Sequence, residues 1–353
     1  MNAVRRLLVA LGLGAAAIVG LAQSRPITLL VPPFDGPEAL GINVATILNL
    51  QVWQTLRKAP YPNPSRLNFG DGLVTWSDQP LASQTHDDAL RAARQNEADL
   101  VLWGKALRYG AGVVVQSHLT IATPRSASIW RVQLPGPGAE TSLAVSLPRL
   151  RYEFGPIVLT GTIVETYSTP DALRLYSSRA GGESIGKVGS YFTAIEQNGT
   201  SALVRSGDVT GWIRLPSLSS NRSEIVDFVG GIMRIMRADW GGADALFARA
   251  LANPQTPAAV KLDAHLYRVV ALEQAGSSGI DEARRAYALN SYDRSAVSYL
   301  VMSEVAAAAK LSVNDPRRTV LQEEARRVLD SNRFLFPSAD EWFTRATVAL
   351  TSR

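Results

Sequence analysis

The sequence predicts a multidomain α+β chain with a small α/β layer, a small closed β-barrel and a C-terminal set of helical hairpins. Strand-type and helical runs alternate in the first part of the chain, and five short strand-type runs separated by tight turns follow. Ala- and Arg-rich segments with a 3.6-residue period fill the remainder. These changes divide the chain into a signal segment 1–22, an α/β domain 23–125, a β-rich connector 126–168, a barrel 169–219 and a helical domain 220–353.

The N-terminus has the three parts of a secretory signal peptide. Arg5 and Arg6 precede an uncharged apolar run over residues 7–21, and the small residues around Ala22 suit signal peptidase. At 1.5 Å per residue this run spans roughly 22–24 Å, which is short of the roughly 30 Å of bilayer hydrocarbon. We therefore expect export with cleavage after Ala22. The alternative is an uncleaved anchor, which would tether the same domains to the membrane.

Residues 23–125 combine strand and helix signals. The run ITLLVPPFDG reads as a strand and a turn, and apolar residues recur at helical spacing over residues 41–58. After a Pro-rich turn, residues 87–97 predict a short helix, and two strands flank a turn at 109–112. The β-α-α-β-β order indicates an α/β layer. This stretch, with ADLVLWGKALRYGAGVVV as its late hairpin, resembles the small α/β domain at the N-terminus of TolB and other bacterial envelope proteins.

The connector at 126–168 contains strand-type runs at 129–134, 143–147 and 157–167, which a PGPG tract interrupts. We interpret them as strands or as an extended link to the next module.

The following segment predicts a closed barrel because it packs five short strands and tight turns into residues 173–218. It resembles the bacterial SH3 domain. The residues that carry this resemblance are Leu173, Leu175, Ser184-Ile185-Gly186-Lys187-Val188, Gly189, Val204, Gly211-Trp212-Ile213 and Leu218.

Two roles are open for Trp212. A buried indole removes about 150–250 Å² from water, worth about 4–6 kcal/mol gross, and a small barrel has few other sources of that stability. We therefore favour Trp212 as the core of the barrel. The alternative is an aromatic binding shelf that Trp212 forms with Tyr176 and Tyr191.

Beyond residue 220 the periodicity predicts paired helices. The expected pairs are 224–237 with 242–252, 257–275 with 280–289, and 294–311 with 316–332, before a last helix at 339–351. A small-large pattern recurs in the second helices, at Ala243, Phe247 and Ala250, at Ala283, Tyr287 and Asn290, and at Ala325, Leu329 and Asn332. This pattern resembles the tetratricopeptide repeat, although the spacing exceeds that family's usual 34 residues. The resemblance leaves open whether the helices form a peptide groove.

Composition and charge exclude several classes of protein. The chain has no cysteine, so neither disulfides nor thiol chemistry contribute. The formal net charge is +5, but basic residues are spread along the chain and do not form a stripe. Because nucleic-acid binding requires clustered Lys and Arg, we expect no nucleic-acid partner.

Catalytic and metal-binding patterns are weak. The three histidines, His86, His118 and His265, lie far apart in the sequence, and we expect none to be a metal ligand or a catalytic base. Residues 182–186 fit G-x-S-x-G, but strand-type residues follow Ser184 where a nucleophile elbow needs a helix. We therefore expect no catalytic residue, metal or cofactor.

Taken with the resemblances, these observations favour a non-enzymatic binding or scaffold protein of the bacterial envelope, located in the periplasm. Its expected partner is an envelope protein or peptidoglycan, contacted through the SH3-like and helical-repeat surfaces. We expect the chain to be attached to the membrane only if the signal segment is not cleaved. Two alternatives stay open: a cell-wall hydrolase, because SH3-like modules often accompany such enzymes, and the regulatory subunit of an envelope complex.

Overall fold

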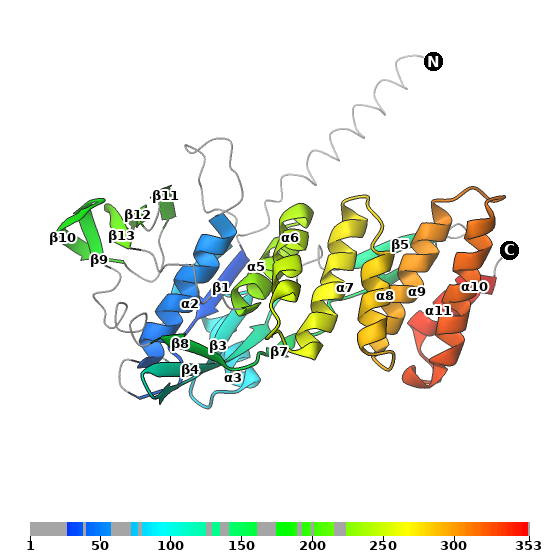
Figure 1. Cartoon of the computed structure of the whole chain (residues 1–353), viewed down its shortest axis with the longest axis horizontal. Helices are drawn as coiled ribbons and strands as arrows, with labels where there is room; N and C mark the ends of the chain where they lie inside the picture. The colour runs from blue at the N-terminus through cyan, green and yellow to red at the C-terminus, as the bar shows by residue number, and fades with distance from the viewer. Residues whose placement is uncertain are drawn as a thin grey trace, which may run out of the picture.

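The computed structural model describes residues 27–37, 40–57, 72–76, 80–124, 129–134, 141–160, 174–188, 193–198, 201–214 and 224–351. The expected signal segment and Tyr191 lie outside these residues. The chain is a mixed α+β structure with several sheets and a C-terminal array of helices (Figure 1). Among the described helices, none is both long enough and apolar enough to cross a membrane.

The first sheet is mixed and has the order β2-β1-β3-β4-β7, with β8 also paired to β4. Its strands are β1 (Ile27–Val31), β2 (Gly72–Trp76), β3 (Leu100–Tyr109), β4 (Gly112–Ile121), β7 (Arg151–Glu153) and β8 (Ile157–Thr160). β1 pairs in parallel with both β2 and β3, and all five of its residues are buried. A central parallel strand buried on both faces reads as a continuous apolar run, which is what ITLLV is.

Two helices cover opposite faces of this sheet. α2 (Leu40–Arg57) packs on the face that carries Leu29, Leu100 and Leu119. α3 (His86–Gln95) packs on the other face over Leu30, Val101 and Trp103. The α3 helix begins where the sequence predicts, because the Thr85 side chain accepts a hydrogen bond from the Asp88 N–H.

The structure adds strands to the expected layer. β2 lies between α2 and α3, where the sequence analysis placed only a turn. The strands of residues 126–168 do not form one separate sheet. β7 and β8 complete the first sheet, while β5 (Trp130–Leu134) and β6 (Thr141–Val145) form a two-stranded hairpin that packs on the helical array.

A second, five-stranded antiparallel sheet follows and curls into a half-barrel, at the far left of Figure 1. Its order is β10-β9-β13-β12-β11. The strands are β9 (Arg174–Ser178), β10 (Gly181–Lys187), β11 (Thr193–Asn198), β12 (Ser201–Ser206) and β13 (Val209–Arg214). Leu175, Ala202, Val204 and Ile213 are its fully buried side chains among those described.

The C-terminal helices are α5 (Glu224–Met236), α6 (Trp240–Ala252), α7 (Ala258–Gln274), α8 (Ile280–Leu289), α9 (Arg294–Ala309), α10 (Pro316–Ser331) and α11 (Glu341–Thr351), with a 3₁₀ turn η4 (Arg333–Leu335) before α11. Consecutive helices pack as hairpins at the positions that the periodicity predicts. Asp239, Asp293 and Asp315 cap α6, α9 and α10, because each aspartate side chain accepts a hydrogen bond from a backbone N–H in the first turn.

One hydrophobic core joins the first sheet to the helical array. All thirteen residues of α5 are buried, because α5 lies between α2, α6 and the strand segment that contains Phe154. Tyr152 and Phe154 contact Phe228 edge-on, and Phe228 also contacts Tyr267. The helices therefore continue the layer that α2 begins, and Figure 1 shows them in one row from α2 to α11.

Candidate functional site

The aromatic residues of the predicted binding shelf lie on the half-barrel. Tyr176 in β9 and Trp212 in β13 are direct cross-strand partners, and both side chains are half-buried. The Arg214 guanidinium carbon lies 5.5 Å from the centre of the Tyr176 ring, within the range of a cation–π interaction. The structure thus brings two of the three predicted residues together, while Tyr191 lies outside the described residues.

The interpretation of Trp212 as the barrel core is wrong. Its neighbours Gly211 and Ile213 are buried, and successive residues of a strand point to opposite faces. Trp212 therefore lies on the face that carries Tyr176. Gly211 permits close packing of β13 on β9, because a Cβ there would lie 2.9 Å from the Leu175 Cβ. The buried residues Leu175 and Ile213 take the place that the sequence analysis gave to the indole.

Ser184 lies within a strand, whereas the sequence analysis expected a loop there with strand residues only after it. It lies in β10 opposite Tyr176, and the strand continues to Lys187. A nucleophile elbow needs a helix directly after its serine, so this geometry is not that of a hydrolase elbow.

Two of the three histidines converge, which the sequence did not indicate. The centroids of the His86 and His118 rings lie 6.0 Å apart, and both rings contact Trp103, which stacks on His118 at 4.4 Å and meets His86 edge-on at 5.2 Å. The Thr120 hydroxyl lies 2.8 Å from His86 Nδ1 and accepts a hydrogen bond from the Trp103 indole N–H. Burial lowers the pKa of both histidines, so both rings are neutral at pH 7. Within the described part of the chain, no group of three or more His, Asp or Glu side chains could hold a metal ion.

His265 takes part in a separate ion-pair network on the helices. Its Nδ1 lies 2.6 Å from Glu282, which also accepts hydrogen bonds from Arg268 and Arg285. Despite the cost of burial, the hydrogen bond from His265 and these cations hold the pKa of Glu282 below its usual value. The network ties α7 to α8.

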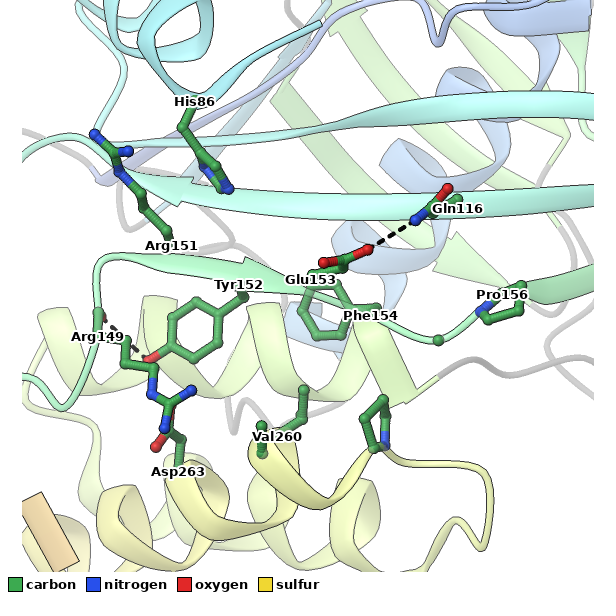
Figure 2. Close-up of a pocket in the computed structure, with 13 residues that line it drawn as sticks. His86, Gln116, Arg149, Arg151, Tyr152, Glu153, Phe154, Pro156, Val260 and Asp263 are labelled. Carbon is green, nitrogen blue, oxygen red and sulfur yellow. Dashed lines mark hydrogen bonds and ion pairs between the residues drawn. The ribbon is translucent and has the colours of Figure 1, made fainter. Parts of the chain in front are cut away.

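The structure also contains a cleft of about 590 Å³ between the first sheet and α7. Figure 2 shows Arg149 and Asp263 towards one end of it, Pro156 towards the other, and Glu153 between them. The cleft is lined from the sheet side and from α7 by His86, Gln116, Arg149, Arg151, Tyr152, Glu153, Phe154, Gly155, Pro156, Pro257, Ala259, Val260 and Asp263. The alternation of Arg151-Tyr152-Glu153-Phe154 is a strand signal that could have indicated this wall.

Asp263 is the most unusual charged group of the cleft. Its side chain is 1% exposed, and Arg149 Nε lies 3.4 Å from one carboxylate oxygen. Neither oxygen accepts a hydrogen bond of standard geometry, although the Tyr152 hydroxyl is close enough to lower the pKa of this carboxyl. Burial raises the pKa of Asp263 to about 7; Arg149 opposes this rise and Asp293 reinforces it. Arg149 also pairs with Asp293 at 3.0 Å, so it links the β6–β7 connection to both α7 and the start of α9.

The inner face of the helical array is not free. Trp130 of β5 contacts Tyr299 of α9, with ring centroids 5.9 Å apart. The Tyr299 hydroxyl donates a hydrogen bond of 2.9 Å to the Ser146 carbonyl. Together with the packing of Tyr152 on Phe228, these contacts cover α5, α7 and α9 with the chain's own strands. At these positions the chain's own strands therefore occupy the face of the helices where a peptide groove could have formed.

Comparison with protein-family models, with curated proteins and with solved structures gives no significant match to this chain.

Proposed function

We propose that this chain is an exported, non-enzymatic binding or scaffold protein of the bacterial envelope. Its half-barrel, which resembles an SH3-like module, contacts peptidoglycan or an envelope protein. The observation that carries this proposal is the pairing of Tyr176 and Trp212 on the face opposite the buried Leu175 and Ile213. Aromatic rings held side by side on a strand pair give a flat apolar surface with polar edges.

The rest of the fold is consistent with a half-barrel that offers its aromatic surface to a partner. The helical array, which resembles tetratricopeptide repeats, uses its inner helices to hold the chain's own strands. Tyr299 binds Ser146, and Arg149 binds Asp293, across these contacts. The array therefore acts as a rigid support, and the half-barrel offers the surface to a partner.

Co-sedimentation with purified peptidoglycan sacculi tests the glycan partner, and capture from periplasmic extract tests a protein partner. We expect the wild-type chain to bind in one of these assays, and Trp212→Ala and Tyr176→Ala to reduce binding by about tenfold or more. Tyr292→Ala is the matched control, because Tyr292 is a 71% exposed aromatic residue on the helical array.

Three outcomes would contradict the proposal. The first is the absence of binding in both assays, and the second is binding that Trp212→Ala leaves unchanged. The third is digestion of the sacculi by the purified chain, which would instead support the cell-wall hydrolase alternative.

A further inference from the structure

No described strand pairs with the outer edge of β7. β7 closes one side of the first sheet, and β4 is its partner among the described strands. The Ile121 N–H donates to the Leu150 carbonyl at 2.8 Å, and the Phe154 N–H donates to the Ser117 carbonyl at 3.0 Å. In an antiparallel pair, bonded and non-bonded residues alternate. The backbone N–H and C=O groups of Arg151 and Glu153 therefore point away from β4.

This open edge borders the cleft. Residues 151–156 form one wall and the first two turns of α7 form the other. The two walls approach each other at one end, where a Cβ on Gly155 would lie 3.5 Å from Pro257 Cγ. A further strand would lie about 4.8 Å from β7, in the space that the cleft leaves open.

The edge is held firmly in place. Tyr152 and Phe154 are buried against Phe228, and the Tyr152 and Tyr267 hydroxyls lie 2.8 Å apart. Burial raises the pKa of both tyrosines well above the usual value, so both hydroxyls stay protonated. A strand fixed on its buried face loses little conformational entropy when another strand pairs with it.

The charges around the cleft favour a cationic ligand. Arg149 and Arg151 are its two guanidinium groups, and both already have ion-pair partners in the chain. They face four carboxylates, namely Asp87, Glu153, Asp263 and Asp293. The Glu153 carboxylate accepts a hydrogen bond from the neutral Gln116 amide. The Glu153 carboxylate is the acceptor that a bound cation would reach, because the oxygens of Asp263 are buried beside Arg149.

We propose that the cleft binds an extended peptide segment of a partner protein, which pairs with the outer edge of β7 and places a lysine or arginine side chain at Glu153. Backbone pairing supplies affinity and the Glu153 carboxylate supplies specificity, as in other cases of strand addition. This site lies on the first sheet and is separate from the aromatic shelf of the half-barrel, so the inference goes beyond the proposed function.

The first test uses the full exported chain and a library of displayed random peptides. We expect selected peptides to share an alternating apolar pattern with at least one Lys or Arg. The tightest of them, labelled for fluorescence anisotropy, should lose binding by about tenfold or more when alternate backbone amides are N-methylated, because those amides form the strand pairing. Replacing its basic residue by Glu should weaken binding to a similar extent. Failure to enrich any peptide, or binding that N-methylation leaves unchanged, would overturn the proposal.

The second test changes the protein at the open edge. Glu153→Pro removes the outward N–H and leaves the bonds to β4 in place, since the N–H of residue 153 does not take part in them. Glu153→Gln is its matched control, because it loses the charge but keeps the N–H. We expect Glu153→Pro to bind the selected peptide at least about fivefold more weakly than Glu153→Gln does.

Amide hydrogen exchange provides a readout that does not depend on a substitution. Peptide binding to the wild-type chain should slow exchange at Arg151 and Glu153, whose N–H groups point into the cleft. Trp212→Ala should leave this protection unchanged, which separates this site from the aromatic shelf. Equal peptide affinity of Glu153→Pro and Glu153→Gln, or unprotected amides at both positions, would show that the peptide does not add to β7.

Discussion

Trp212 and Ile213 are neighbours in β13, yet they occupy opposite faces of the sheet. Ile213 is fully buried with Leu175 and Val204, while Trp212 is half-buried beside Tyr176. The indole is the larger apolar group, so area alone predicts that it fills the core. The alternation of the strand decides otherwise, because Gly211 and Ile213 both face the interior.

The two side chains should therefore differ in their effect on stability. Ile213→Ala should lower the free energy of unfolding by about 2–5 kcal/mol, because it leaves a cavity in a packed interior. Trp212→Ala should cost about 1 kcal/mol, since its side chain keeps contact with solvent. Urea denaturation of the full chain measures both. A larger loss for Trp212→Ala than for Ile213→Ala would restore the indole as the barrel core.

Asp263 should make stability depend on pH. Its pKa is raised from 3.8 to about 7 in the folded chain, mainly by burial. Between about pH 4 and 7 the folded state therefore holds a proton that the unfolded chain has released. The contribution of Asp263 to the free energy of unfolding is therefore greatest below about pH 4 and decreases as the pH rises to about 7. Asp263→Asn cannot ionise, so its free energy of unfolding should rise relative to wild type over this range.

Urea denaturation at several values between pH 4 and 8 checks this prediction. Glu304→Gln is a useful companion, because burial and the neighbouring Glu324 raise the pKa of Glu304 to about 8. The free energy of unfolding of Glu304→Gln should also rise relative to wild type as the pH increases. Glu304 lies on α9, outside the residues that line the cleft. A difference between Asp263→Asn and wild type that stays constant from pH 4 to 8 would contradict the raised pKa of Asp263.

At the scale of single elements, local sequence signals were most informative for the helices. The 3.6-residue period indicated helices such as α6, α8 and α10, which have a buried stripe and an exposed polar face, and aspartates mark three of the helix starts. Asn332, one of the repeated positions, donates a hydrogen bond of 3.1 Å to the Tyr287 hydroxyl, another of those positions. Two of the repeated positions are thus in direct contact between successive hairpins.

The crossing of α5 and α6 depends on a glycine. A Cβ on Gly231 would lie 2.7–2.9 Å from three atoms of the Phe247 ring, which is buried and cannot withdraw easily. Gly231→Ala should therefore destabilise the chain by about 1–3 kcal/mol through overpacking. Gly241→Ala is the matched control in α6, since no atom lies within 4 Å of the added Cβ. Thermal melting should show a lower Tm for Gly231→Ala and an unchanged or higher Tm for Gly241→Ala. Equal melting temperatures of the two variants would show that α5 and α6 can move apart to accept the added methyl group without loss of stability.

At the scale of the whole molecule, the α/β layer and the helical array share one core. The continuous cluster of buried apolar residues runs from Leu29 in β1 to Leu350 in α11. The Arg234 guanidinium donates a hydrogen bond of 2.7 Å to the Leu56 carbonyl at the end of α2, which fixes α5 against α2. The boundary between the connector and the helical domain is therefore a packed interface.

The helical array should not be stable alone. A fragment of residues 224–353 would expose the faces of α5 and α9 that Tyr152, Phe154 and Trp130 cover in the full chain. Loss of this burial removes much of the hydrophobic stabilisation of the inner helices. We expect the fragment to bind the dye ANS and to melt without a sharp transition. Cooperative melting of the fragment at the Tm of the full chain would contradict a shared core.

The sequence by itself determined the local structure, namely most helices and the short strands of the second sheet, although it predicted a closed barrel where the structure has a curled sheet. These depend on periodicity and turns within short stretches. The tertiary structure decided which side chains are neighbours: Trp212 on the outer face, His86 beside His118, and the open edge of β7 across from Asp263. Those arrangements depend on pairing between segments distant in the chain. The residues Arg151-Tyr152-Glu153-Phe154 show the limit, because their alternation indicates a strand but does not say which sheet it joins.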